Sequence, residues 1–243
     1  MVRRSRHVLF TLLLLLAALF TRLGFWQLSR LHARQVANAE ALKGRNAPPV
    51  DLNTWRDEGG LTNRWVVARG HYDRSQEIVL RGHVYLEIPG VEVVTPFQIE
   101  GRDTAILVNR GFVPSPDAVT ASLDTLNEPG TIQVQGLAAA IPVSNDRGGP
   151  LEAGGKLTYR RLDLAELRAR IPYPILDVYL LQNPDSSLPR RPMRQEPPAL
   201  TNGPHLSYAI QWFSFALIAI VGGWVLLFRR PRTSPPIQDR AFP

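Results

Sequence analysis

Two long apolar runs stand near the ends of this 243-residue chain, and shorter alternating runs fill the part between them. The first long run covers residues 8–28, and the second covers residues 206–228 without a charged residue. A helix of roughly 20 apolar residues is long enough to cross a hydrocarbon core of about 30 Å. We therefore predict transmembrane helices at 8–28 and 205–228, which flank one folded domain at 29–204.

The pattern between the two runs is typical of short β-strands. Runs rich in Val, Ile and Leu occur at residues 65–70, 77–80, 91–99, 105–108, 131–137 and 177–181. Turn residues such as Arg81-Gly82 separate them, which favours an antiparallel sheet or a small barrel. One helix is predicted at 163–170, with Asp163 as its cap and Pro172 ending it. The predicted fold is a membrane protein with two transmembrane helices flanking a mainly β domain with a minor helix.

The segments that join the domain to the apolar runs are polar. Residues 30–44 are rich in alanine and polar side chains, so we expect the first helix to continue beyond the apolar run. Two prolines, Pro48 and Pro49, stop it. Residues 182–202 are rich in Pro, Arg and Ser and are interpreted as an extended linker.

Charge supports a topology rather than a nucleic-acid surface. The formal net charge is +7, but residues 29–204 contain 20 Lys or Arg and 20 Asp or Glu, so the excess lies at the two ends. Arginines beside a span stay on the cytoplasmic side. We therefore expect cytoplasmic termini at 1–7 and 229–243, an extracytoplasmic domain at 29–204, and contact with the lipid bilayer. The first run also resembles a signal peptide, but no suitable cleavage pattern follows it closely, which favours a retained anchor.

The usual catalytic motifs are missing from the sequence. The chain has no cysteine and two methionines, which excludes disulfides and thiolate metal sites. The sequence contains no nucleophile elbow, zinc-protease helix or dinucleotide loop. We therefore expect a protein that is not an enzyme, and a membrane-tethered enzyme is the weakest of the hypotheses.

The start of the second apolar run carries the most informative side chains. With 100° per residue, His205, Tyr208 and Trp212 fall on one side of a helix. Small residues continue that side towards the cytoplasm: Ala209, Ala216, Ala219 and Gly223. Such a face resembles a shallow groove in which a flat macrocycle could lie, with the imidazole bonding its iron. The alternative is close helix packing and an interfacial aromatic belt, which geometry alone favours.

Three arginines in other segments are candidates for binding anions or a partner. Arg22, Trp26 and Arg30 repeat every fourth position on the first helix, which favours anchoring at the membrane surface. The alternative is that their guanidinium groups bind the carboxylates of a cofactor or a partner subunit. Arg110 lies in residues 107–114 (LVNRGFVP), which we interpret as a strand that ends in a glycine turn.

Four stretches of the chain together resemble the Surfeit locus protein 1 (Shy1) family of cytochrome c oxidase assembly factors. They occur in the family's order, at residues 23–30, residues 80–81 with 90–97, residues 107–114 and residues 205–212. Two departures are Phe112, where a tryptophan is usual, and Gly203-Pro204 before the histidine. The resemblance implies a factor for biogenesis of an aa3-type haem–copper oxidase in the bacterial plasma membrane.

In some bacterial members of that family, the histidine of the second span carries haem a, and His205 matches it. The resemblance thus implies His205 as an axial ligand of the haem iron, with Tyr208 and Trp212 beside the ring. Arg30 or Arg110 would meet the propionates or the partner. The implied partners are the oxidase catalytic subunit and its assembly machinery, with no nucleic acid. A cofactor-free scaffold for oxidase intermediates is the alternative.

Overall fold

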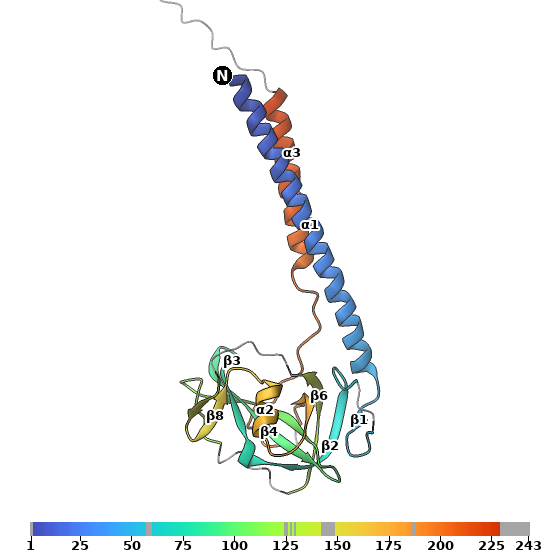
Figure 1. Ribbon diagram of the computed structural model, residues 1–243, viewed down its shortest axis with the longest axis vertical. Helices are drawn as coiled ribbons and strands as arrows, with labels where there is room; N and C mark the ends of the chain where they lie inside the picture. Colours follow the sequence, from blue (N-terminus) through green and yellow to red (C-terminus); the bar gives the residue numbers. More distant parts are fainter. Residues whose placement is uncertain are drawn as a thin grey trace, which may run out of the picture. The chain divides into compact units, whose positions relative to one another are not determined.

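The computed structural model describes residues 2–228, apart from residues 57–59, 124–125, 127, 129, 142–148 and 186–187. The chain divides into two units (Figure 1). The first unit, which we call the helix pair, comprises Met1–Asn38 and Thr201–Pro243. The second unit, which we call the barrel domain, comprises Ala39–Leu200.

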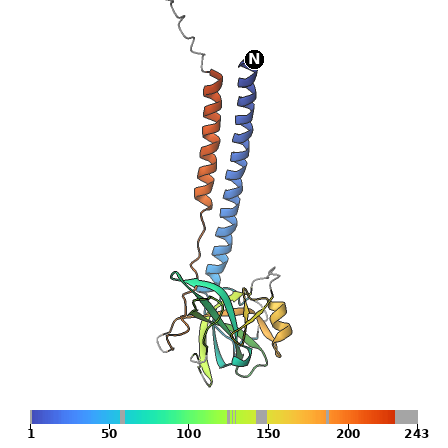
Figure 2. The same ribbon diagram turned by 90° about the vertical axis from the view of Figure 1, so that its left-hand side faces the viewer.

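Two antiparallel helices, α1 (Val2–Asn46) and α3 (His205–Phe228), form the helix pair (Figure 2). Their leucine- and alanine-rich sequences favour helix, and both helices are long and apolar enough to cross a membrane. The first helix extends beyond its apolar run, because the polar residues that follow the run are also helical. It ends at Asn46, immediately before the prolines, as predicted.

Small residues bring the two helices of the pair close together. Ala209, Ala216, Ala219 and Gly223 are the buried residues of α3, which shows that the small-residue face is covered. A side chain at Gly223 would lie 3.1 Å from the Phe10 ring, and one at Gly24 would lie 2.6 Å from the Phe213 ring. The expectation of an open groove along this face is therefore wrong. The packing interpretation is confirmed, because close helix contact requires small side chains.

The barrel domain is a twisted sheet that closes on itself. Its strands are β1 (Val50–Asp51), β2 (Trp65–Tyr72), β3 (Ile78–Tyr85), β4 (Ile88–Ile99), β5 (Ala105–Pro114), β6 (Ile132–Ala140), β7 (Leu151–Ala153), β8 (Lys156–Tyr159) and β9 (Ile175–Gln182). Their order is β1-β2-β6-β9-β5-β4-β3-β8-β7, and β2 also pairs with β4. That extra pairing closes a ring of β2, β6, β9, β5 and β4, so the prediction of a small barrel is confirmed.

The pairing directions differ from the prediction of an antiparallel sheet. Strand β5 pairs in parallel with β9, and the short pairings β3–β8 and β1–β2 are also parallel. Parallel neighbours need a long connection between them. The chain between β5 and β9 supplies it, because this segment contains β6, β7, β8 and helix α2 (Leu164–Arg170).

Two predicted turns lie inside strands. Arg81-Gly82 forms an irregularity within β3, where the register with β4 shifts between Leu80 and His83. Gly111 lies within β5, which continues to Pro114 rather than ending at a glycine turn. Its φ of 118° is unfavourable for other residues, and the register shifts here between Val93 and Val94. Both glycines therefore mark strand irregularities and not strand ends.

The apolar core of the barrel domain lies inside the sheet and beneath α2. One cluster is formed by Val66, Phe97, Ile106, Leu180 and their neighbours. Helix α2 adds Leu167 to a second cluster. As predicted, Asp163 caps this helix, because its carboxylate accepts the N–H groups of residues 165 and 166.

The segment after β9 packs against the barrel domain, so its interpretation as a simple extended linker is only partly right. The backbone groups of Met193 and Phe112 exchange two hydrogen bonds, with N···O distances of 2.9 and 2.7 Å. This isolated β-bridge lies beside Gly111, where any side chain would meet the Met193 backbone. The linker therefore adds a further edge contact to β5.

Candidate functional site

The candidate site lies at the start of α3, where a histidine contacts a buried amide of α1. Nδ1 of His205 lies 2.9 Å from Oε1 of Gln27, and Gln27 is only 8% exposed. An amide oxygen only accepts hydrogen bonds, so a hydrogen bond in this orientation of the amide requires the tautomer that carries its proton on Nδ1. In that tautomer Nε2 has a lone pair. Within the described part of the chain, no group hydrogen-bonds to Nε2 of this half-buried ring.

Polar groups of α1 hold the chain that leads into α3. The Asn38 amide donates to the Thr201 carbonyl and to Oδ1 of Asn202, each at 3.0 Å. Nε of Arg34 donates to the same Thr201 carbonyl at 3.2 Å. Gln27, Arg34 and Asn38 are spaced to share one face of α1. This face therefore fixes both the entry to α3 and the first side chain of that helix.

The two predicted aromatic neighbours have different environments. Tyr208 is 47% exposed, whereas Trp212 is half-buried and stacks on Phe20 with ring centroids 5.7 Å apart. The Trp212 ring therefore lies between the helices, where it adds apolar contact near the histidine. Tyr208 is the aromatic side chain that is accessible one turn beyond His205.

Arg30 is the exposed cation nearest in sequence to the buried amide. It follows Gln27 by three residues, which places both on neighbouring positions of one helix face. In the described residues Arg30 makes no hydrogen bond or ion pair, and its side chain is exposed. Its guanidinium can therefore bind an anionic group such as a carboxylate.

The other predicted arginine, Arg110, is inside the barrel domain and not on its surface. It is fully buried, and its guanidinium lies 3.2 Å from Oε2 of Glu77 and 3.0 Å from Oε1 of Glu128. It also donates to the Leu126 carbonyl. The expectation that Arg110 meets a cofactor or a partner is therefore a poor fit to this geometry. The alternation of β5 turns this side chain inward, where buried carboxylates neutralise it.

The contacts around Arg110 extend to three further side chains, Arg194, Thr95 and Tyr72. Arg194 reaches Oε1 of Glu128 at 2.6 Å, and Thr95 donates to Glu77 at 2.9 Å. The Arg110 guanidinium lies 4.6 Å from the centre of the Tyr72 ring. Burial raises the pKa of the Tyr72 hydroxyl, so it stays neutral. We call Arg110, Glu77, Glu128 and Arg194 the buried ion cluster.

Comparisons with known proteins identify the family. The family model described as the SURF1 family matches residues 14–217, which include the whole barrel domain and part of each apolar helix. The chain belongs to the SURF1 family.

Relatives in this family span bacteria and animals. A SURF1-like protein of Rickettsia bellii is 27% identical over 228 residues, with 90% of each chain covered. A SURF1-like protein of Monosiga brevicollis is 26% identical, with 86% of this chain and 83% of the relative covered. Surfeit locus protein 1 of Mus musculus is 34% identical over 117 residues, which cover 42% of this chain and 38% of the mouse protein. The predicted resemblance is thus confirmed at the level of the family.

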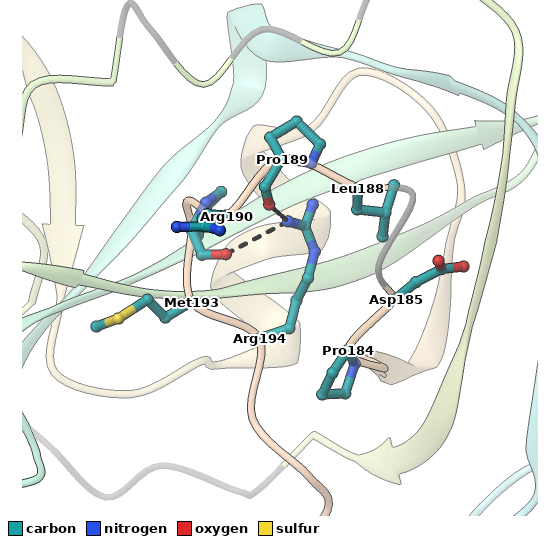
Figure 3. A pocket seen from close by; sticks show the side chains of 8 residues that line it. Pro184, Asp185, Leu188, Pro189, Arg190, Met193 and Arg194 are labelled. Atoms are coloured by element: carbon teal, nitrogen blue, oxygen red, sulfur yellow. Dashed lines mark hydrogen bonds between the residues drawn. The ribbon is translucent and has the colours of Figure 1, made fainter.

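The barrel domain of this SURF1-family chain has two notable cavities. One, of about 560 Å³, lies within the segment after β9, where Arg194 donates to the carbonyls of Pro189 and Pro192 at 2.8 and 3.3 Å (Figure 3). The Arg194 side chain thereby holds this segment in a closed turn. The charged side chains of Asp185 and Arg190 also line this cavity.

The second cavity, of about 450 Å³, contains a histidine–carboxylate pair. Nδ1 of His83 lies 3.4 Å from Oε1 of Glu92, whose other oxygen accepts from Asn109 at 2.7 Å. The hydrogen bond to Glu92 raises the pKa of His83. Burial opposes ionisation of Glu92, but its bonds to His83 and Asn109 outweigh burial and lower its pKa. The pair is therefore charged near the lower end of the physiological pH range.

Sequence reasoning missed Gln27 and the His83–Glu92 pair. A glutamine at the polar end of an apolar span is itself a signal, because an unpaired amide there is costly. The His83–Glu92 pair had no such signal, because the bulge in β3 determines which side chains meet. Among the described residues, no group of three or more His, Cys, Asp or Glu side chains could hold a metal ion.

Proposed function

We propose that this SURF1-family protein is a membrane-anchored assembly factor for cytochrome c oxidase that binds haem a through His205. In this proposal it assists insertion of the haem into the oxidase catalytic subunit. Family membership supports the assembly role. The observation that carries haem binding is the His205–Gln27 contact, because it favours the tautomer in which Nε2 is unprotonated, and Nε2 has no hydrogen-bond partner among the described residues.

The proposed topology follows from the helices and the arginines. Residues 8–28 and 205–228 span the plasma membrane of a bacterium, and residues 29–204 lie outside the cytoplasm. The two apolar helices and the arginine-rich ends support this arrangement. The polar contacts at Gln27 and His205 then lie at the outer end of each span, where a polar side chain is tolerated.

The residues of the helix pair fit a haem in their donor chemistry. A bound haem would supply an iron that a neutral imidazole nitrogen can ligate. His205 would donate Nε2, Tyr208 would offer an accessible ring beside it, and Arg30 would pair with a propionate. Trp212 would support the helix that carries the histidine, because its ring stacks on Phe20 of α1. Arg110 has no part in this proposal.

The test is the absorption spectrum of the full-length protein in detergent, reduced minus oxidised, after production with haem a available. We expect haem bands in the wild type and their loss in His205→Ala. The matched control is His32→Ala, which removes an exposed histidine of α1 and should keep the bands. A wild type without bands, or a His205→Ala variant with full haem occupancy, would overturn the proposal.

A cofactor-free scaffold for oxidase intermediates is the second candidate. The packed face of α3 favours it, because the small residues that were expected to form a groove contact α1 instead. The scaffold reading predicts that oxidase subunits co-purify with the protein while no haem band is seen. It further predicts that His205→Ala retains those subunits at the wild-type level.

A further inference from the structure

We propose that Gln27 is a positioning residue that sets the tautomer and orientation of His205. This inference rests on the proposed function, because it assigns a role in haem ligation to a second side chain. Gln27 would not touch the haem. Its amide oxygen would hold the proton at Nδ1 and thereby keep the lone pair at Nε2, the nitrogen that bonds the iron.

The burial of Gln27 needs an explanation. It is 8% exposed in a helix pair whose other buried members on α3 are alanines and a glycine. Burying an amide between apolar helices costs free energy unless it is hydrogen-bonded. The 2.9 Å contact to Nδ1 of His205 is the hydrogen bond that offsets this cost. A leucine would fill this space as well, so packing alone does not explain why an amide is buried here.

The contact decides between two forms of the imidazole. A neutral histidine carries its proton on either ring nitrogen, and the partner of one nitrogen decides which. Ligating histidines commonly donate their other N–H to an acceptor, which fixes ring orientation and strengthens the ligand. Without an acceptor at Nδ1, the ring can rotate, and part of the population carries its proton on Nε2. That part cannot bond iron.

The backbone around His205 is held independently of Gln27. Asn38 and Arg34 bind Thr201 and Asn202, and the amide of Tyr208 donates to the Pro204 carbonyl at 3.1 Å. Loss of the Gln27 amide should therefore leave α3 in place and change only the imidazole. The effect of the Gln27 side chain on the imidazole can therefore be measured without a change in the backbone of α3.

The experiment compares Gln27→Leu and Gln27→Glu in the full-length, detergent-solubilised protein, titrated with haem a. Gln27→Leu keeps the approximate size but removes the acceptor, so we expect affinity to fall roughly 10- to 100-fold. Gln27→Glu keeps an acceptor and should restore most of the affinity. Because a carboxylate acceptor makes the imidazole a stronger donor to ferric iron, its haem midpoint potential should lie below that of the wild type.

If Gln27 had only a structural role, Gln27→Glu would not lower the midpoint potential of the haem below the wild-type value. A tenfold stronger preference for ferric haem corresponds to a potential about 59 mV lower. The matched control is Thr21→Val, which removes a polar group of α1 bonded only to its own helix. That variant should keep both the affinity and the potential of the wild type.

The outcomes separate this inference from the proposed function. If the wild type binds haem, His205→Ala does not, and both Gln27 variants match the wild type in affinity and potential, then Gln27 has no positioning role and only this inference fails. If the wild type binds no haem, the proposed function fails and the inference fails with it. Circular dichroism of each variant confirms that the helices remain intact.

Discussion

The barrel domain and the helix pair each bury a polar contact in apolar surroundings, but only the contact in the barrel domain pairs opposite charges. In the buried ion cluster, the Arg110 guanidinium is matched by two carboxylates and a backbone carbonyl. In the helix pair, one amide oxygen meets one imidazole nitrogen. The second imidazole nitrogen has no hydrogen-bond partner among the described residues.

This difference separates a structural role from a site for chemistry. A buried charge is stable only when its neighbours satisfy it, so a matched cluster rigidifies the fold and offers nothing to a ligand. In the helix pair, the contact holds one imidazole nitrogen and leaves the lone pair of the other available to a ligand. Pairing of opposite charges, and not burial or complete hydrogen bonding, therefore distinguishes Arg110 from His205, because Nε of Arg110 also has no hydrogen-bond partner among the described residues.

The largest expected effect in the barrel domain follows from removing Arg110. Arg110→Met leaves the carboxylates of Glu77 and Glu128 buried without their shared cation. Breaking a buried pair in this way costs about 3–5 kcal/mol. For a domain of this size we expect the unfolding midpoint to fall by roughly 6–20 °C. Thermal unfolding of the full-length protein in detergent measures it.

The matched control is Arg69→Met, which removes an exposed arginine of the same domain. Arg69 pairs with Glu100 at 3.0 Å, with side-chain exposures of 67% and 57%. An exposed pair contributes about 0–1 kcal/mol, so its midpoint should barely move. Equal effects of the two substitutions would show that the cluster does not stabilise the barrel, and the contrast with the helix pair would fail.

A smaller effect is expected for Arg194→Met. Glu128 keeps Arg110 as its partner, but the segment after β9 loses the bonds from Arg194 to Glu128, Gln182 and Pro189. Loss of hydrogen bonds to a charged group costs about 1.5–3 kcal/mol. We expect faster amide hydrogen exchange in residues 189–198, with the β-strands still protected. Unchanged exchange in that segment would show that Arg194 does not hold it.

The smallest effect concerns pH and the His83–Glu92 pair. The pKa of His83 is raised, so its contribution to stability is present below its unfolded value of about 6.5 and is lost as pH rises through the folded pKa. Glu92 has a lowered pKa, so it stays ionised at about pH 5.5. This pair should therefore stabilise the wild type more at about pH 5.5 than at about pH 8.

His83→Gln should remove this pH dependence. The difference between the unfolding midpoints at the two pH values should shrink in the variant relative to the wild type. Because His83 is a third exposed, the change is expected to be small beside that of Arg110→Met. A variant that keeps the full wild-type difference would assign the pH dependence to other groups.

Some features of the fold could be read from the sequence for simple physical reasons. Long apolar runs and prolines fix the helix pair, because hydropathy and the missing proline N–H act locally. The cap at Asp163 is equally local. Most strand positions were recognisable from runs of β-branched residues. The parallel pairing of β5 with β9 was not, because it depends on contacts between segments far apart in the chain.

The side chains of the site also fall into those that the sequence predicts and those that it does not. Helix periodicity placed His205 and Trp212 on one face, but it could not show that α1 covers that face. Arg110 was interpreted as a strand-end residue, because the glycine that follows it is typical of a turn. The bulge in β5 and the partners Glu77 and Glu128 come from other strands and loops, so only the folded chain reveals them.

The most direct test of the central claim is the amount of haem a bound per folded molecule in His205→Ala, measured beside the wild type by absorbance. We expect haem occupancy to be lost while the unfolding midpoint of the barrel domain stays at the wild-type value. A His205→Ala protein that retains its haem would contradict the claim that Nε2 of His205 binds the haem iron.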